Sequence, residues 1–190
     1  MRDLCVVKVG GSLFNHAGLG PGLRTWLDRF SSPNVLLVPG GGPTTDVVRI
    51  LDQRHRLGEE KAHWLALRAL SLNAFLLAEL LPGSVVTESI ATPVGKIAIL
   101  DPFPFCREDE RNQSRTLSHS WSVTSDSVAA RVAICAEARE LVLLKSVAIP
   151  TAMTWREAGR LGFVDREFAN TVGSARNLYV RAINFRELLM

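Results

Sequence analysis

A short apolar run that contains a lysine and ends at two glycines constrains this chain more than any other stretch. Residues 4–13 read LCVVKVGGSL, the pattern of a buried strand that carries Lys8 and breaks at Gly10 and Gly11. A buried lysine needs an anionic partner, and glycines at a strand end let backbone N–H groups approach a ligand, typically a phosphate. Residues 35–42, VLLVPGGG, repeat the design. The two elements therefore predict two anions held close together, as a phosphoryl donor and its acceptor would be.

Apolar runs of strand length alternate with helical patterns along the chain. We expect strands near residues 4–9, 35–38, 85–87, 96–100, 141–147 and 177–183, and helices near 22–30, 43–51, 59–81, 128–134, 155–159 and 165–171, with a last helical turn from Phe185. This alternation is typical of a mostly parallel sheet covered by helices on both faces. No repeat or internal linker divides the sequence, and its length suits one core. We therefore predict a single α/β domain over residues 1–190.

Two stretches differ from this alternation. The helix expected at 59–81 is apolar around most of its circumference, so it lies either in the core or against a second copy of the chain. Both placements stay open here, and the second predicts a homodimer. Residues 101–121 resemble no regular element, because Pro102 and Pro104 interrupt their start and a mixed charge run follows at 107–115. We interpret this segment as an exposed loop rather than a binding patch, long enough to act as a lid.

The composition limits the class of partner. A net charge of +3 is small, which favours a small anionic ligand over nucleic acid. The longest apolar stretch, 62–81, carries charged side chains that argue against a membrane span, and Lys8 interrupts any signal-peptide core. The cysteines at 5, 106 and 135 are odd in number and lack metal-ligand spacing. We therefore expect reduced thiols in a cytoplasmic protein.

Two lysines and one aspartate could carry out phosphoryl transfer. This reaction needs positive charge and N–H donors around the transferred group, and a correctly placed attacking oxygen. Lys8 and Lys145 both lie at the ends of apolar strands, at the sheet edge where open α/β folds bind ligands. Asp126, at a helix start, could hold both ammonium groups by accepting their hydrogen bonds. The glycines would then form the anion sites, with Gly10, Gly11 and Ser12 for the donor phosphates and Gly40, Gly41 and Gly42 for the acceptor.

Each of these residues also has a purely structural interpretation. Lys8 and Lys145 could be edge-strand lysines that reach solvent. Asp126 could favour the dipole of its helix, and the triple glycine at 40–42 could be a tight turn. Three adjacent glycines, however, cost more backbone entropy than a simple turn requires.

Several common sites do not fit the sequence. Lys8 precedes its glycines, unlike a Walker A lysine, and neither a dinucleotide fingerprint nor a hydrolase nucleophile elbow is present. We interpret His55, His63 and His119 as isolated surface or packed residues rather than metal ligands, and Trp121 as a packing residue.

Four motifs, taken in their order, resemble the amino acid kinase superfamily, which includes acetylglutamate, aspartate, uridylate and isopentenyl phosphate kinases. They are KVGGS at 8–12, PGGG at 39–42, TSDSVAA at 124–130 and LLKS at 143–146. The resemblance covers nearly the whole chain. It implies a three-layer α/β/α sandwich, ATP with Mg²⁺ as the phosphoryl donor, and a carboxylate or phosphate as the acceptor.

The resemblance also implies roles for particular residues. Lys8 and Lys145 would stabilise the transferred phosphoryl group, and Asp126 would organise them. Ser146 would bind ATP together with Lys145 and the first glycine turn. The acceptor would contact the second glycine turn and two helix-start residues, Thr124 and Ser125. No protein metal ligand is implied.

Three further motifs resemble one small branch of this superfamily. They are AHW at 62–64, SWSVTSD at 120–126 and GFVDREF at 162–168. The branch contains aspartokinase-like kinases found with tetrahydromethanopterin- and methanofuran-dependent one-carbon metabolism. It implies a furan phosphate as the acceptor.

The sequence differs from the superfamily after the second lysine. Many relatives have an Asp- and Gly-rich loop there that helps to hold the adenine nucleotide, whereas residues 147–151 read VAIPT. Two functions therefore remain: an ATP-dependent kinase for a small anionic acceptor, and a catalytically silent kinase-fold protein that binds nucleotides or anions for regulation or storage.

Overall fold

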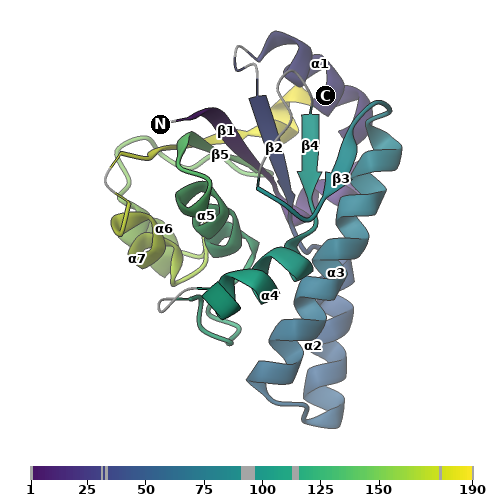
Figure 1. Cartoon of the computed structure of the whole chain (residues 1–190), viewed down its shortest axis with the longest axis vertical. Helices are drawn as coiled ribbons and strands as arrows, with labels where there is room; N and C mark the ends of the chain where they lie inside the picture. Colours follow the sequence, from purple (N-terminus) through teal and green to yellow (C-terminus); the bar gives the residue numbers. More distant parts are fainter. Residues whose placement is uncertain are drawn as a thin grey trace.

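A six-stranded sheet forms the centre of the protein (Figure 1). The structure is a computed structural model that describes residues 2–30, 32, 34–90, 97–112, 116–175 and 177–189. The strands are β1 (Arg2–Val9), β2 (Asn34–Pro39), β3 (Val85–Thr87), β4 (Ile97–Leu100), β5 (Ala138–Lys145) and β6 (Tyr179–Asn184). They lie in the order β3-β4-β2-β1-β5-β6, and their five pairings are parallel. Residue 96, the first of the strand expected at 96–100, lies outside the described residues.

Helices cover both faces of this sheet. They are α1 (Leu19–Arg29), α2 (Pro43–His55), α3 (Glu59–Leu80), α4 (Pro102–Asn112), α5 (Ser125–Cys135), α6 (Trp155–Arg160) and α7 (Phe168–Gly173), with 3₁₀ turns η1 (Gly11–Asn15) and η2 (Phe185–Leu188). On one face, Val7 packs with Leu23 of α1 and Leu77 of α3. On the other face, the core contains Val128 of α5 and Phe168 of α7. The predicted α/β/α sandwich with a parallel sheet is confirmed.

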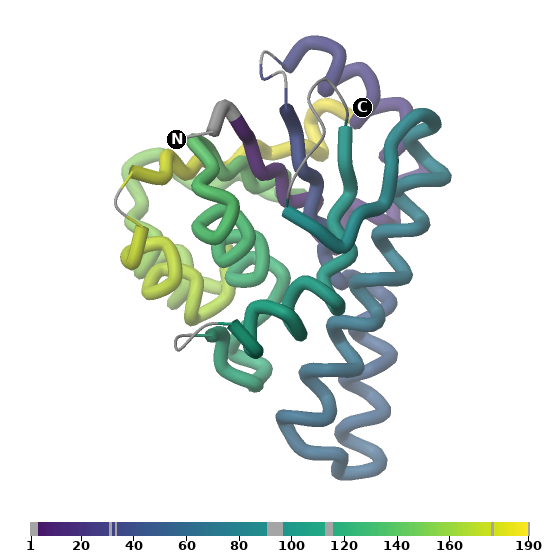
Figure 2. Tube along the Cα trace, viewed as in Figure 1, coloured from purple at the N-terminus to yellow at the C-terminus, as the bar shows by residue number. Residues whose placement is uncertain are grey.

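The long helix α3 serves both cores and still presents an exposed face. Leu67 belongs to the core on the α5 side and Leu77 to the core on the α1 side. Leu72 and Phe75, between them in sequence, are 61% and 56% exposed. Together with α2, the first half of α3 extends beyond the sheet as a helical hairpin (Figure 2). The core placement expected for this helix therefore holds for one face, and contact of the exposed face with a second copy stays a prediction.

The prediction of a loop at 101–121 was wrong, because α4 occupies its first half. Pro102 and Pro104 lie in the first helical turn, where no backbone N–H is needed and proline is tolerated. Asp109 belongs to the supposedly solvated charge run, yet both its oxygens accept hydrogen bonds of 2.8 Å from Arg131. Residues 113–115 lie outside the described part.

Two findings bear on the surroundings of the chain. No helix of the described residues is long and apolar enough to cross a membrane. Cys5, Cys106 and Cys135 are free thiols.

Candidate active site

Side-chain alternation along β1 and β5 brings Lys8 and Lys145 to the same face of the sheet. Successive side chains of a strand point to opposite faces. Val6 of β1 and Leu143 of β5 both belong to the core on the α5 side, so Lys8 and Lys145, each two residues further on, face that side as well. The strand register pairs Lys8 with Leu143. The two lysines therefore lie on neighbouring strands, at their carboxyl ends and against α5.

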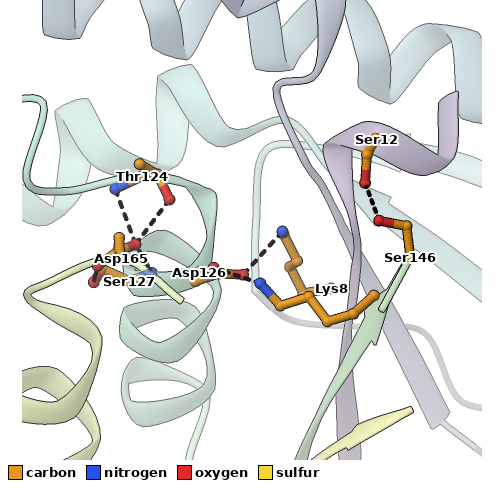
Figure 3. Close-up of polar contacts among 8 residues, drawn as sticks. Lys8, Ser12, Thr124, Asp126, Ser127, Ser146 and Asp165 are labelled. Carbon is orange, nitrogen blue, oxygen red and sulfur yellow. Dashed lines mark hydrogen bonds and ion pairs between the residues drawn. The ribbon is translucent and has the colours of Figure 1, made fainter. Parts of the chain in front are cut away.

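Asp126, in the first turn of α5, contacts both ammonium groups (Figure 3). Its Oδ1 lies 2.9 Å from Lys8 Nζ, and its Oδ2 accepts a 2.7 Å hydrogen bond from Lys145 Nζ. All three residues are buried. The structure thus brings together the three residues that the sequence proposed as a phosphoryl-transfer centre, and their catalytic roles remain predictions.

The protonation states leave this cluster with a surplus of positive charge. Burial alone would raise the pKa of Asp126, but the two ammonium groups outweigh it and lower that pKa from 3.8 to about 2. Burial and the charge of Lys8 lower the pKa of Lys145 from 10.5 to about 8, although Asp126 opposes them. Among the groups in direct contact, two ammonium groups face one carboxylate near pH 7, and this local excess attracts an anion, although the charge of Asp165 also acts on Lys145.

The two glycine turns interlock beside the lysines. A Cβ atom on Gly11 would lie 2.3 Å from the Gly42 nitrogen, and one on Gly42 would lie 2.2 Å from the Gly11 oxygen. Gly42 also has a φ of +57°, in the left-handed region that favours glycine. From α3, the buried Asn73 amide donates hydrogen bonds of 2.7 Å to the carbonyls of Gly40 and Gly41. Only glycine allows this backbone contact.

A cavity of about 190 Å³ opens between these turns and α5. Thr45 and five of the predicted site residues contribute polar groups to the lining. The five are Gly11, Gly41, Gly42, Thr124 and Ser125. Apolar walls come from α3, α5 and the segment before α5, namely Ala66, Leu67, Leu70, Val123 and Val128. Arg49, His63, Ser120 and Trp121 complete the lining. The cavity thus runs from the neighbourhood of Asp126 to a mostly apolar wall.

Two sequence interpretations at this wall were wrong. His63 and His119 are not isolated, because their rings stack with centroids 4.8 Å apart. Burial, with the neighbouring His119, lowers the pKa of His63 from 6.5 to about 4, so its imidazole is neutral near pH 7. Trp121 lines the cavity instead of simply packing: its Nε1 donates a 2.8 Å hydrogen bond to Asp52, and the Arg49 guanidinium lies 4.2 Å from its ring centroid.

The remaining predicted residues do not line the cavity. The Gly10 N–H donates to the Leu144 carbonyl at 2.8 Å, so it extends the strand pairing instead of pointing at a ligand. The hydroxyls of Ser12, in η1, and Ser146, directly after β5, form a 2.7 Å hydrogen bond (Figure 3). Gly40 lies next to the backbone of Gly11. Across the described ranges, no three His, Cys, Asp or Glu side chains lie together as metal ligands.

Sequence reasoning missed Asn73, Arg49 and Asp165. A buried asparagine in the middle of an apolar helix was the available signal for Asn73, since such a residue needs hydrogen-bond partners. Asp165 stood inside the GFVDREF motif without a role, and its partners lie about 40 residues away. Arg49 had no sequence signal, because only the fold brings it over Trp121.

Comparison with known proteins gives one family and one fold. The sequence model of the amino acid kinase family matches residues 3–149 of this chain. A [5-(aminomethyl)furan-3-yl]methyl phosphate kinase from Methanocaldococcus jannaschii is 26% identical over 156 residues, which are 75% of this chain and 65% of that protein. The chain therefore spans slightly less than two thirds of this relative.

Solved structures agree on the architecture. The UMP kinase of Ureaplasma parvum superposes with a TM-score of 0.64 at 14% identity, covering 97% of this chain and 90% of that one. The uridylate kinase of Archaeoglobus fulgidus gives 0.60 at 15% identity, covering 99% and 94%. An aspartate kinase from Synechocystis gives 0.61 at 15% identity, covering 94% of this chain and 38% of that one. At these identities the likeness shows the fold alone.

Proposed function

Because this chain belongs to the amino acid kinase family, we propose that it is an ATP-dependent kinase that phosphorylates a small anionic acceptor. One observation supports this proposal above the others: two buried ammonium groups flank one carboxylate at the carboxyl edge of the sheet, next to a cavity. Ligands of open α/β folds bind at this edge. Phosphoryl transfer depends mainly on placing positive charge there.

Each residue of the centre has a definite task in this proposal. Lys8 and Lys145 would neutralise the oxygens of the phosphoryl group in transit, and Asp126 would keep the two ammonium groups from separating. The acceptor oxygen would bond to the γ-phosphorus of ATP while the bond to the β,γ-bridging oxygen breaks and its electron pair leaves with ADP. Mg²⁺, bound through the ATP phosphates, would neutralise further charge. The positive surplus and the glycine turns fit such a polyphosphate.

The acceptor is proposed to be an anion because neither Asp126 nor His63 is an efficient general base, and Lys145, whose pKa is about 8, is needed as a cation. Asp126 is held by two lysines and has a pKa of about 2. His63, in the cavity wall, has a pKa of about 4. An efficient base has a pKa near the working pH, which neither group has. A phosphate or carboxylate oxygen is already deprotonated and needs no base.

Within this class we propose a phosphate ester on a small flat ring, such as a furan phosphate of a one-carbon cofactor pathway. Leu67, Leu70 and Val128 form an apolar wall, and the Trp121 indole lies beside it. A flat ring fits such a wall, while the glycine turns and the lysines attract its phosphate. The M. jannaschii relative acts, by its name, on an aminomethylfuran phosphate.

Transfer of labelled phosphate tests the proposal. The protein is incubated with [γ-³²P]ATP, Mg²⁺ and either [5-(aminomethyl)furan-3-yl]methyl phosphate or a panel of carboxylates. We expect label in the furan phosphate, and a loss of about 10³-fold in Lys8→Ala, because one transition-state donor alone contributes about 10²–10³-fold. Lys61→Ala, at an exposed position of α3, is the matched control. Equal, negligible transfer by wild type and Lys8→Ala, both of which bind ATP, would favour the silent binding protein instead.

The proposal includes a homodimer and a cytoplasmic location. The exposed leucines and phenylalanine of α3 would pack against the same face of a second copy, because a twofold axis pairs a patch with itself. Sedimentation velocity would show a dimer that Leu72→Glu dissociates and that Leu161→Glu, at an equally exposed leucine elsewhere, leaves intact. The three free thiols support a reducing compartment.

A further inference from the structure

Asp165 joins the segment between α6 and α7 to the start of α5. One of its oxygens, Oδ2, accepts hydrogen bonds from the Thr124 N–H at 3.0 Å, the Thr124 hydroxyl at 2.9 Å and the Ser127 N–H at 2.9 Å. Its Oδ1 accepts a further bond from the Ser127 hydroxyl. Figure 3 shows these contacts beside Asp126. One carboxylate thus receives four donors from two residues.

These bonds do for α5 what a local cap does for other helices. The first N–H groups of a helix lack partners within the helix, and a side chain of the N-cap residue usually accepts one of them. Thr124 is the N-cap of α5, but its side chain makes no capping hydrogen bond. Asp165 supplies the acceptor instead, and its negative charge suits the positive end of the helix. The start of α5 is therefore held from a distant part of the chain.

Asp126 lies in the turn that is held in this way. Thr124 and Ser127, the two anchored residues, flank it in sequence, and its carboxylate contacts Lys8 and Lys145. A shift of this turn would move the carboxylate relative to both ammonium groups. We infer that Asp165 is a positioning residue that fixes Asp126, and through it the two lysines, for phosphoryl transfer. This inference rests on the proposed kinase activity.

A second helix cap, at α6, provides a control that distinguishes positioning of the centre from ordinary helix stabilisation. At α6, Glu157 accepts hydrogen bonds from the N–H and the hydroxyl of Thr154, at 3.0 and 2.9 Å. The donors are of the same kind as at Asp165, but Glu157 is exposed and caps α6, which carries none of the three charged residues of the centre. Glu157→Ala therefore removes a cap without disturbing the centre.

The experiment compares Asp165→Ala, Asp165→Asn and Glu157→Ala in the full chain, with ATP and [5-(aminomethyl)furan-3-yl]methyl phosphate. We expect Asp165→Ala to lower kcat about 30-fold with KM for ATP changed less than about threefold, because misplaced catalytic groups slow the chemical step. Asparagine keeps an acceptor oxygen, so Asp165→Asn should retain kcat within about fivefold of wild type. Glu157→Ala should match wild type in both constants. A wild-type kcat in Asp165→Ala, or an equal loss in Asp165→Asn and Asp165→Ala, would overturn the inference.

Lysine reactivity supplies a readout that does not depend on turnover. Acetic anhydride labelling followed by mass spectrometry should modify Lys8 and Lys145 faster in Asp165→Ala than in wild type and Glu157→Ala, because their contacts with Asp126 loosen. Equal labelling would contradict the inference even if wild type transfers no phosphate, an outcome that would count against the proposed function alone. If Asp165→Ala does not fold, Ser127→Ala removes one of the four donors, and unchanged labelling in that variant would be equally decisive.

Discussion

The glycine turns on one side of Lys145 are held by more contacts than residues 147–152 on its other side. On the side of the cavity, the glycine turns touch through their backbones, and Asn73 holds two of their carbonyls from inside α3. On the other side, residues 147–152 are exposed or half-exposed. A side-chain hydrogen bond between the hydroxyls of Ser12 and Ser146 joins the start of this segment to η1. One side is fixed by backbone contacts and buried hydrogen bonds, whereas on the other only Ile149 packs against the core and its neighbours in 147–152 are exposed.

This difference indicates which of the two substrates, the acceptor or the nucleotide, would be selected more strictly. A preformed cavity discriminates ligands by shape, because its walls need not be ordered when the ligand binds. An open segment can contribute little beyond the charge of the lysines beside it. We therefore expect the acceptor to be selected strictly and the nucleotide to be held mainly through its phosphates. The following predictions test this contrast.

Gly11→Ala should have the largest effect, because it separates the two turns. The added Cβ would meet the Gly42 nitrogen at 2.3 Å, and backbone atoms cannot yield as a side-chain end can. We expect the free energy of unfolding to fall by about 3 kcal/mol, and phosphoryl transfer in the folded fraction to fall at least about 100-fold. Chemical denaturation and steady-state kinetics measure the two losses. Gly173→Ala, where nothing lies within 4 Å, is the control, and an equal effect in both variants would refute the interlock.

Asn73→Ala should also destabilise the glycine turns, but by less than Gly11→Ala. It leaves the buried carbonyls of Gly40 and Gly41 without this donor, which should cost about 2 kcal/mol of unfolding free energy. Because the turn then moves, we expect KM for the acceptor to rise about tenfold while KM for ATP stays within about twofold. Asn170→Ala, at an exposed asparagine of α7, should change neither constant. A rise confined to the KM of ATP would reverse the assignment of the two sides.

The centre of the site could be predicted from sequence for a physical reason. Strand alternation has a period of two, and parallel strands end at one edge, so two lysines at strand ends must lie close if their strands are neighbours. The strand with Lys8 and the strand with Lys145 are indeed neighbours. The helix with Asp126 covers the face to which both lysines point. The sequence pattern and the sheet topology thus both bring Lys8, Lys145 and Asp126 together.

The walls of the site could not be predicted in this way. The stacked rings of His63 and His119 come from a helix and a distant segment, and no local spacing links them. The helix α4 was missed because its two prolines were interpreted as interruptions, whereas both fall in the first turn. Asp165 reaches α5 only through the tertiary fold. Side-chain contacts between remote segments are set by packing, which a single sequence does not show.

The pH dependence should report on the lysine that separates the two sides. In the free protein Lys145 has a pKa of about 8, so it loses its positive charge as pH rises above 8. We expect kcat/KM for ATP, which reflects the free enzyme, to fall about tenfold per pH unit there. The limb for kcat should lie at higher pH, because bound phosphates favour the ammonium form. Lys145→Arg should remove the limb, and a wild-type profile that stays flat to pH 9.5 would contradict the lowered pKa.

The smallest effects are expected on the open side. Val147→Ala and Thr151→Ala change exposed residues, and such substitutions alter free energies by less than about 0.5 kcal/mol, or about twofold in kcat/KM. For the same reason we expect GTP to replace ATP with a loss of less than about fivefold, because few wall contacts would distinguish the bases. Steady-state kinetics with both nucleotides, at saturating acceptor, measures this ratio. A preference for ATP of 100-fold or more would mean that residues 147–152 order around the base, and the two sides would then be equally selective.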